Sequence, residues 1–223
     1  KIKIITKISI IKKDKIKESM NDSVNLSLKN LNRKYLDYLI IHDIEFFKKN
    51  NPKKIYKHLT NLKKKNLCKK IGFSVYTPSD IEFICKFGIP DVLQIPLSIF
   101  NRSFEKLRIL KILKKKGVEI HARSIFMKGF LLMDNSELPN YLKKYKKLHL
   151  NFQNWCNRHQ VSQLEACINY IRNNTYVSKI IIGIDNVEEL KEIIKFFNKN
   201  KKIFPKKIHS NDNNLIDIRK WKK

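Results

Sequence analysis

The chain has 223 residues, 42% of them hydrophobic, which suffices for one domain with a large core. Its formal net charge is +28, carried mainly by lysine in a chain also rich in isoleucine and asparagine, a joint bias typical of AT-rich genomes. No apolar run approaches the roughly 20 residues of a membrane span, and no signal peptide or Cys-x-x-Cys pair is visible, so we expect a cytoplasmic protein with reduced thiols.

Strand and helix signals alternate along the whole chain. Short β-branched apolar runs predict strands at 2–8, 35–41, 68–74, 92–96, 118–124 and 176–183. Helical patterns with stop signals predict helices at 14–31, 52–66, 78–87, 103–116, 138–148, 161–173 and 187–198, and we expect the tail at 214–221 to dock as a short helix. Short apolar strands separated by helices indicate parallel pairing.

Six strand–helix units favour a particular α/β architecture. No Gly-x-Gly-x-x-Gly follows a strand, which argues against an open doubly wound sheet. A (β/α)8 TIM barrel fits better, but it needs eight units and about 250 residues. The chain also begins with lysine. We therefore expect a single incomplete barrel domain over residues 1–223, N-terminally truncated and lacking its first two strand–helix units.

Polar residues end the expected strands. Lys7 closes the first strand and His42 closes the second. The C-terminal ends of parallel barrel strands form one rim, and that rim carries the chemistry of such barrels. A lysine and a histidine on neighbouring strand ends would therefore share one pocket.

Several segments together resemble the aldo/keto reductase family. They are Leu26-Ser27-Leu28-Lys29-Asn30-Leu31 with Leu36-Asp37-Tyr38-Leu39-Ile40-Ile41-His42, then Ile71-Gly72-Phe73-Ser74, Leu93-Gln94-Ile95-Pro96, and residues 177–183 with 187–190. Ser74-Val75-Tyr76 and the Arg-Ser-x-Phe-x-x-Gly-x-Leu-Leu motif within residues 121–133 resemble a bacterial branch, some of whose members are linked to surface-sugar metabolism.

The resemblance implies a reductase that transfers hydride from NADPH to a carbonyl. Lys7 and His42 match the family's catalytic lysine and histidine. A tyrosine acid, with an ordinary pKa of about 10, needs a nearby cation to donate its proton near neutral pH. The family's tyrosine and aspartate come from the second strand and the loop after it, which have no counterpart here, so we expect residues 1–223 alone to be inactive.

The same resemblance implies a set of cofactor contacts. Ser74 and Gln94 match positions that hold the nicotinamide carboxamide, and Arg123 would stack on the ring or pair with phosphate. Ser124 and Lys128 would approach the pyrophosphate, and Gly183, Asp185 and Asn186 the adenosine phosphate. The resemblance implies NADP as the cofactor. Asp185 would repel a 2′-phosphate, so NAD stays open as the alternative.

The conclusion from the sequence is an NAD(P)H-dependent oxidoreductase that reduces an aldehyde or ketone, such as a sugar-like metabolite. Two alternatives stay open: a non-catalytic barrel that acts as a binding module, and a basic nucleic-acid-binding protein. Lysine clusters at 63–65 and 114–116 lie near helix ends, where cations suit the helix dipole. Since no aromatic residues interleave with them, we expect no nucleic-acid partner. The histidines show no metal-ligand spacing, so no metal is expected.

Overall fold

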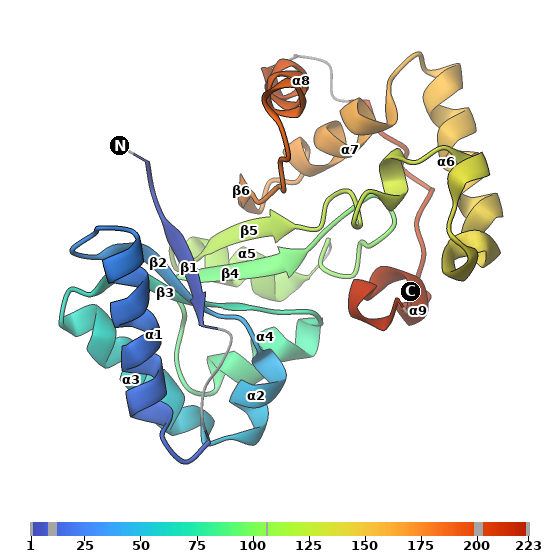
Figure 1. Ribbon diagram of the computed structural model, residues 1–223. Helices are drawn as coiled ribbons and strands as arrows, with labels where there is room; N and C mark the ends of the chain where they lie inside the picture. The colour runs from blue at the N-terminus through green and yellow to red at the C-terminus, as the bar shows by residue number, and fades with distance from the viewer. Residues whose placement is uncertain (1, 9–12, 106, 199–202, 222–223) are drawn as a thin grey trace. The chain divides into compact units, whose positions relative to one another are not determined.

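A computed structural model describes residues 2–8, 13–105, 107–198 and 203–221 (Figure 1). Its six strands form one sheet whose order follows the order of the chain. The strands are β1 (Ile5–Ile8), β2 (Leu36–Ile41), β3 (Cys68–Ser74), β4 (Val92–Pro96), β5 (Glu119–Arg123) and β6 (Val177–Ile180). The pairs from β1 to β4 are parallel. The expected fold class, an incomplete (β/α)8 barrel, is confirmed, whereas the two further units before Lys1 stay a prediction.

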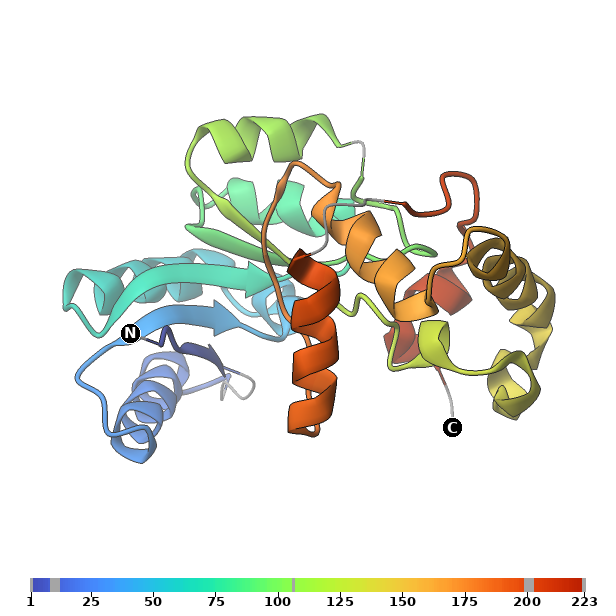
Figure 2. The same cartoon turned by 90° about the horizontal axis from the view of Figure 1, so that it is seen from above.

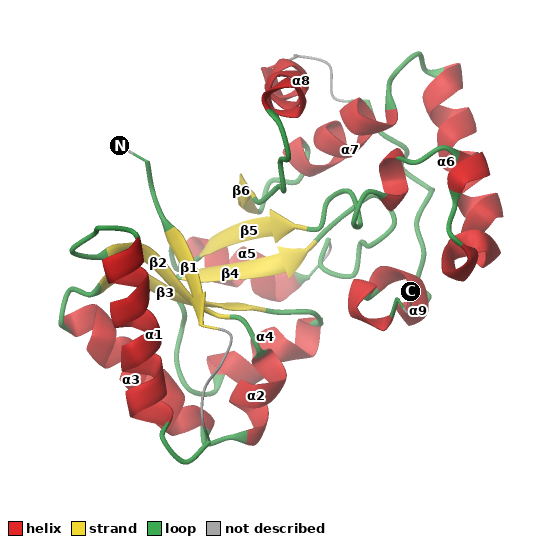
Figure 3. Cartoon of the chain, in the orientation of Figure 1, coloured by secondary structure: helices red, strands yellow, loops and turns green. Residues whose placement is uncertain are grey.

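Helices follow the strands as Figure 3 shows. They are α1 (Ile16–Asn30), α2 (Ile44–Lys49), α3 (Pro52–Lys64), α4 (Pro78–Cys85), α5 (Arg108–Lys115), α6 (Lys146–Arg158), α7 (Gln163–Arg172), α8 (Val187–Asn198) and α9 (Asn213–Ile216). Short 3-10 turns lie at η1 (Phe130–Leu132), η2 (Asn135–Glu137), η3 (Asn140–Tyr145) and η4 (Ile218–Lys220).

Two expectations about helices were wrong. The segment 138–148 was expected to form one helix, but it forms η3 and only the start of α6. Pro139 precedes the 3-10 turn, and α6 gains its buried face from His149, Phe152 and Cys156, which lie beyond the expected end. Helix α2 was not expected, because six residues are too few for a helical period to be visible.

The chain divides into two compact units, and the division runs through β4 and β5. The first unit holds residues 1–95 and 109–120, and the second holds residues 96–108 and 121–223. The expectation of a single domain stays a prediction. None of the helices in the described ranges combines the length and apolar character that crossing a membrane requires.

In the first unit, the two faces of the strands pack differently. One face carries the buried cluster Tyr38, Ile40 and Val92, with Ile5 against it. On the other face, the ring of Phe73 contacts the rings of Phe47 in α2 and Tyr56 in α3, with centroids 4.8 and 5.9 Å apart. The first face is therefore the interior of the barrel wall, and the second is covered by helices.

The core of the second unit is rich in aromatic rings. The Phe100 ring lies 5.8 Å from the Phe130 ring and 5.9 Å from the Phe152 ring. Helices α7 and α8 lie side by side, as Figure 2 also shows, through a cluster of Ile168, Ile193 and Phe196. This packing holds α8 against α7, and the loop from β6 leads into α8.

Candidate functional site

Four of the expected site residues lie on the interior face of the first unit. Lys7 pairs in register with Ile40, and His42 follows two residues later, with its backbone N–H donating to the Ile8 carbonyl at 2.9 Å. Since side chains alternate along a strand, Lys7, Ile40 and His42 share one face. The expected catalytic pair therefore lies at the C-terminal ends of neighbouring parallel strands.

The expected carboxamide contacts lie on the next two strands. Ser74 pairs in register with Gln94, two residues beyond the pair of Gly72 and Val92. Because Val92 belongs to the interior cluster, the alternation places Ser74 and Gln94 on the interior face too. Both side chains are fully buried. Lys7, His42, Ser74 and Gln94 are thus brought to one face of four successive strands.

A polar network closes the opposite end of this face. Lys70 forms an ion pair with Glu119, and the Tyr38 hydroxyl donates to Glu119 Oε2 at 3.0 Å. These residues come from the N-terminal parts of β2, β3 and β5. The sequence analysis did not predict these three residues. The alternation of side chains along a strand, which places Gln94 on the interior face, places them there as well. The network therefore lies at the N-terminal ends of these strands, and the expected catalytic residues lie at their C-terminal ends.

Gln94 stands out among these residues because its side chain is buried without a protein partner. Within the described part of the chain, neither its amide oxygen nor its amide nitrogen has a hydrogen-bond partner. Leaving such a group unsatisfied costs about 1–3 kcal/mol, so buried amides of this kind call for an explanation. A ligand that offers both a donor and an acceptor would satisfy it.

The second unit contains a cavity of about 500 Å³ next to the end of β5. Four expected cofactor residues line it: Ser124, Lys128, Gly183 and Asp185. The remaining lining residues come from the loop after β5 and η1, from α7, from the segment that follows β6, and from α8: Ile125, Phe126, Met127, Gly129, Leu132, Leu164, Ile181, Ile182, Glu189, Glu192 and Ile193. The pocket thus brings together residues that are far apart in the sequence, such as Lys128 and Gly183, which are 55 positions apart.

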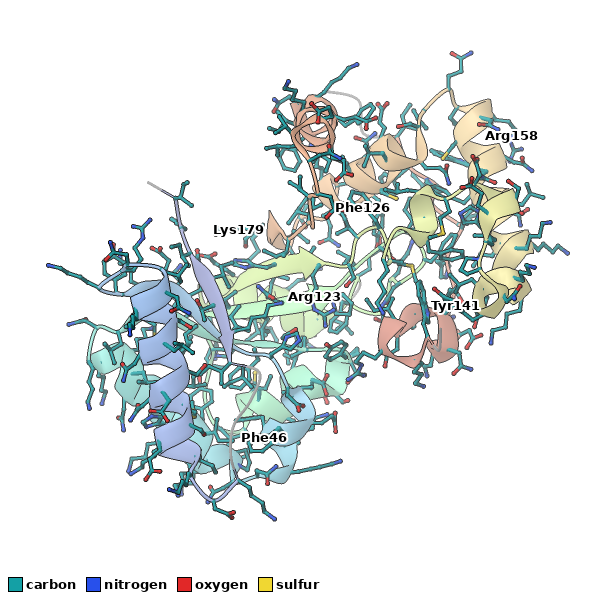
Figure 4. All side chains as sticks on the ribbon, in the orientation of Figure 1. Phe46, Arg123, Phe126, Tyr141, Arg158 and Lys179 are labelled. Carbon is teal, nitrogen blue, oxygen red and sulfur yellow. The ribbon has the colours of Figure 1, made fainter. Side chains whose placement is uncertain are left out.

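Arg123 and Asn186 border this pocket through their neighbours. Arg123 ends β5, as Figure 4 shows, and its guanidinium Nη1 donates to Ser124 Oγ at 3.3 Å. Its side chain is buried. Asn186 donates from its side-chain amide to the Glu189 carboxylate at 3.2 Å. Both expected residues therefore contact the pocket's lining.

The loop after β5 has a strained backbone. Ser124, Met127 and Lys128 have positive φ angles of 57°, 51° and 54°. Non-glycine residues adopt this region at a cost, and they persist where the surrounding structure holds them, often at functional sites. Here the Met127 N–H donates to the Ser124 carbonyl at 3.0 Å. The resulting tight turn exposes the Lys128 side chain at the pocket.

The C-terminal tail holds the Lys128 side chain. Lys128 Nζ donates to the Ile218 carbonyl at 3.2 Å and lies 6.0 Å from the centre of the Trp221 ring. The tail itself is anchored by fully buried Leu215, whose carbonyl accepts a hydrogen bond from the Trp221 indole at 3.0 Å. The sequence predicted a docked tail but did not connect it to Lys128.

The ten expected residues therefore fall into two groups. Four lie on the interior face of the first unit, and six lie in or beside the pocket of the second unit. In the described residues, no cluster of three or more His, Cys, Asp or Glu side chains offers a metal site.

Comparisons with known proteins agree on one family. A model of the aldo/keto reductase family matches residues 1–208. The solved structure of aldo-keto reductase AKR11C1 from Bacillus halodurans superposes in its apo form with a TM-score of 0.70 at 17% identity, over 98% of this chain and 71% of that one. Its holo form gives 0.69 at 18% identity, over 100% and 72%.

A thermostable aldo-keto reductase, Tm1743, solved with the inhibitor epalrestat, gives a TM-score of 0.64 at 18% identity, over 89% of this chain and 66% of that one. At such identities the likeness shows the fold. No curated protein matches the chain. Since the family model spans nearly the whole chain and the strands follow the order that this fold requires, the chain belongs to the aldo/keto reductase family, a family of carbonyl oxidoreductases.

Proposed function

We propose that this protein is an NAD(P)H-dependent reductase of an aldehyde or ketone. In the first unit, the interior strand ends carry residues that suit a nicotinamide and a carbonyl. In the second unit, the pocket carries residues that suit an adenosine. The motif within residues 121–133 makes a sugar-like metabolite our first candidate substrate.

The observation that carries this proposal is the unsatisfied amide of Gln94. A carboxamide presents one carbonyl oxygen and one NH₂ group, which complement the NH₂ group and the oxygen of a glutamine. The nicotinamide carboxamide is such a group. Ser74, paired in register with Gln94 and equally buried, adds a hydroxyl beside it. The residues therefore fit the cofactor that the family typically uses.

Gly183 supports the proposal in the second unit. A Cβ atom at Gly72 would lie 2.1 Å from the Val92 carbonyl oxygen, so the strand packing alone requires glycine there. At Gly183 a Cβ atom would meet no atom of the described residues within 4 Å, although the chain has only five glycines. Packing within the protein gives no reason for this glycine, whereas a ligand that approaches the backbone closely would.

Each catalytic residue would act on the reacting oxygen. A bound NAD(P)H supplies the hydride. His42 would orient the carbonyl by donating a hydrogen bond to its oxygen. Lys7 would lower the pKa of the acid that protonates this oxygen. Residues 1–223 have no position that matches the family's acid, so we propose that they do not turn over by themselves.

Titration calorimetry with NADH and NADPH tests the proposal. The wild-type chain should bind at least one dinucleotide. Gln94→Leu and Gly183→Val should each weaken that binding about tenfold or more, because one removes a hydrogen-bonding pair and the other fills the approach to the backbone. Glu188→Gln is the control, since this exposed residue lies on α8 but does not line the pocket.

Circular dichroism of each variant should be unchanged, because neither substitution removes a packed group. If a folded wild-type chain binds neither dinucleotide, or if both variants bind as the wild type does, the proposal is wrong.

A further inference from the structure

The lining of the pocket in the second unit has more acidic than basic residues, whereas the whole chain has more basic than acidic residues. Lysine and arginine outnumber aspartate and glutamate by 48 to 20 in the whole sequence. The lining of this pocket includes three carboxylates, Asp185, Glu189 and Glu192, and one cation, Lys128, while the Arg123 guanidinium borders it through Ser124. Drift towards lysine cannot explain such a reversal, because drift would have added cations here as well.

The N-terminus of α8, at the pocket, is already capped by the side chain of Asn186, with the Glu189 carboxylate beside it. Asn186 Oδ1 accepts from the Glu189 N–H at 2.8 Å, and Glu189 Oε2 accepts from the Asp185 N–H at 3.0 Å. This reciprocal arrangement satisfies backbone donors at the start of α8. The start of a helix ordinarily attracts phosphate, but here the Asn186 side chain caps the helix and the Glu189 carboxylate lies beside it.

The one cation of the lining is also engaged. Lys128 Nζ donates to the Ile218 carbonyl in the tail. A phosphate group near α8 would therefore find carboxylates and a capped helix. A ribose with free hydroxyl groups would instead find hydrogen-bond acceptors, since ionised carboxylates accept hydrogen bonds from hydroxyls.

We propose that this pocket selects a dinucleotide whose adenosine ribose carries a free 2′-hydroxyl, so that the enzyme uses NADH in preference to NADPH. This inference rests on the proposed function, and it names Asp185, Glu189 and Glu192 as specificity-determining residues. The physical cause is repulsion between these carboxylates and a 2′-phosphate, which carries a charge of about −1.5 to −2 when its second pKa is near 6.

Binding of two pairs of probes to the full chain tests this inference. The first pair is NADH and NADPH, and the second is 5′-AMP and adenosine 2′,5′-bisphosphate, which occupy the adenosine half alone. At low ionic strength, the dissociation constant of each 2′-phosphorylated probe should exceed that of its partner about tenfold or more. The ratio should shrink in about 0.5 M salt, where charges are screened within a few ångströms.

Neutralising the carboxylates should change the ratio in a defined direction. The double substitution Asp185→Asn with Glu192→Gln leaves Asn186 and Glu189 at the start of α8 in place. It should tighten NADPH binding several-fold and weaken NADH binding, because amide oxygens accept hydrogen bonds from ribose hydroxyls less strongly than carboxylates do. Glu188→Gln is the matched control on the same helix, and it should leave both dissociation constants unchanged.

Three outcomes would overturn the inference. NADPH binding as tight as or tighter than NADH overturns the inference and leaves the proposed function standing. An unchanged ratio in the double variant shows that the carboxylates do not set the preference. Binding of neither dinucleotide overturns the proposed function together with the inference.

Discussion

Buried amides in this protein differ in what they contact. Asn101 is a satisfied one: its Nδ2 donates to the Ile216 carbonyl at 3.2 Å and its Oδ1 accepts from the Ser103 hydroxyl at 2.7 Å. Gln94 is fully buried, and its amide has no partner in the described residues. The two side chains therefore carry opposite energetic consequences for the protein without a ligand.

We predict that Gln94→Leu increases the free energy of unfolding of the ligand-free chain by about 1 kcal/mol, because it removes a buried group that lacks hydrogen bonds. Asn101→Leu should decrease it by about 1–3 kcal/mol, because it breaks satisfied bonds. Urea unfolding of both variants measures the difference. A Gln94→Leu variant as destabilised as Asn101→Leu would show that Gln94 is a structural residue.

At the strand ends, Lys7→Met and His42→Ala should lower turnover about 100- to 1,000-fold in the catalytically active protein, because positioned groups of this kind act mainly in the transition state. Dinucleotide affinity should change much less, since both residues are proposed to act on the reacting oxygen. Steady-state kinetics with calorimetry separates the two effects, and Lys3→Met is an exposed control before β1. Near-normal turnover in both variants would place the reaction elsewhere.

Helix α6 is joined to the turn η1 by a buried histidine. His149 Nε2 lies 2.9 Å from the Phe130 carbonyl oxygen, and its Nδ1 lies 3.2 Å from Asn135 Nδ2. Burial lowers the pKa of His149 below its usual value, outweighing the opposite effects of the Phe130 carbonyl and Asp134. Folding therefore favours the neutral imidazole, and the protonated form is favoured by unfolding.

The sign of the pH dependence follows from this lowered pKa. The contribution of His149 to stability is complete above the unfolded pKa of about 6.5, and it is lost as the pH falls below that value towards the folded pKa. We predict that the free energy of unfolding drops between about pH 7.5 and pH 5.5, and that His149→Gln reduces this drop.

Urea unfolding at the two pH values measures the effect, and His209→Gln is the exposed control. If the His149→Gln variant keeps the whole drop, another group is responsible; His58 is the first to test, because burial lowers its pKa as well.

Whether an element could be predicted from the sequence depended on its length and on which of its faces is buried. The strand ends that carry Lys7, His42, Ser74 and Gln94 were predictable because β-branched runs bounded by turns determine where a strand stops. Helix α2 escaped because it has six residues, although Asp43, whose carboxylate accepts from the Phe46 N–H at 2.9 Å, is a helix-start signal.

The site was predictable where it depends on strands and unpredictable where it depends on packing. Gly183 and Asp185 were expected because they follow a strand. Glu189 and Glu192 were not, because acidic residues on an exposed helix face resemble ordinary solvated surface. Only the packing of α8 beside α7 shows that they face the loop after β5, although the spacing of Asn186 and Glu189 already indicates a helix cap.

At the scale of the whole molecule, the sheet has two terminal strands. The strand order of the described residues starts at β1 and ends at β6, and both are short, with β-branched residues at each end. Strand edges that lack a neighbouring strand can pair with strands of other chains. The net charge of +28 opposes such pairing through repulsion between molecules.

We predict that residues 1–223 expressed alone associate, and that association increases with salt, because screening weakens the repulsion while leaving the edges unchanged. They should also lack carbonyl-reducing activity. Light scattering between about 0.05 and 0.5 M salt measures the association, and a reduction assay runs beside it. A monodisperse monomer that turns over would show that both expectations fail.

The agreement between strand order and chain order bears on how the protein forms during synthesis. Each strand from β2 to β4 pairs with the strand made just before it, as Tyr38 of β2 pairs with Ile5 of β1. A nascent chain could therefore add one strand at a time to a growing sheet as it leaves the ribosome, without waiting for a later segment to complete an earlier pair. In such a chain, translation itself would guide the register of the sheet.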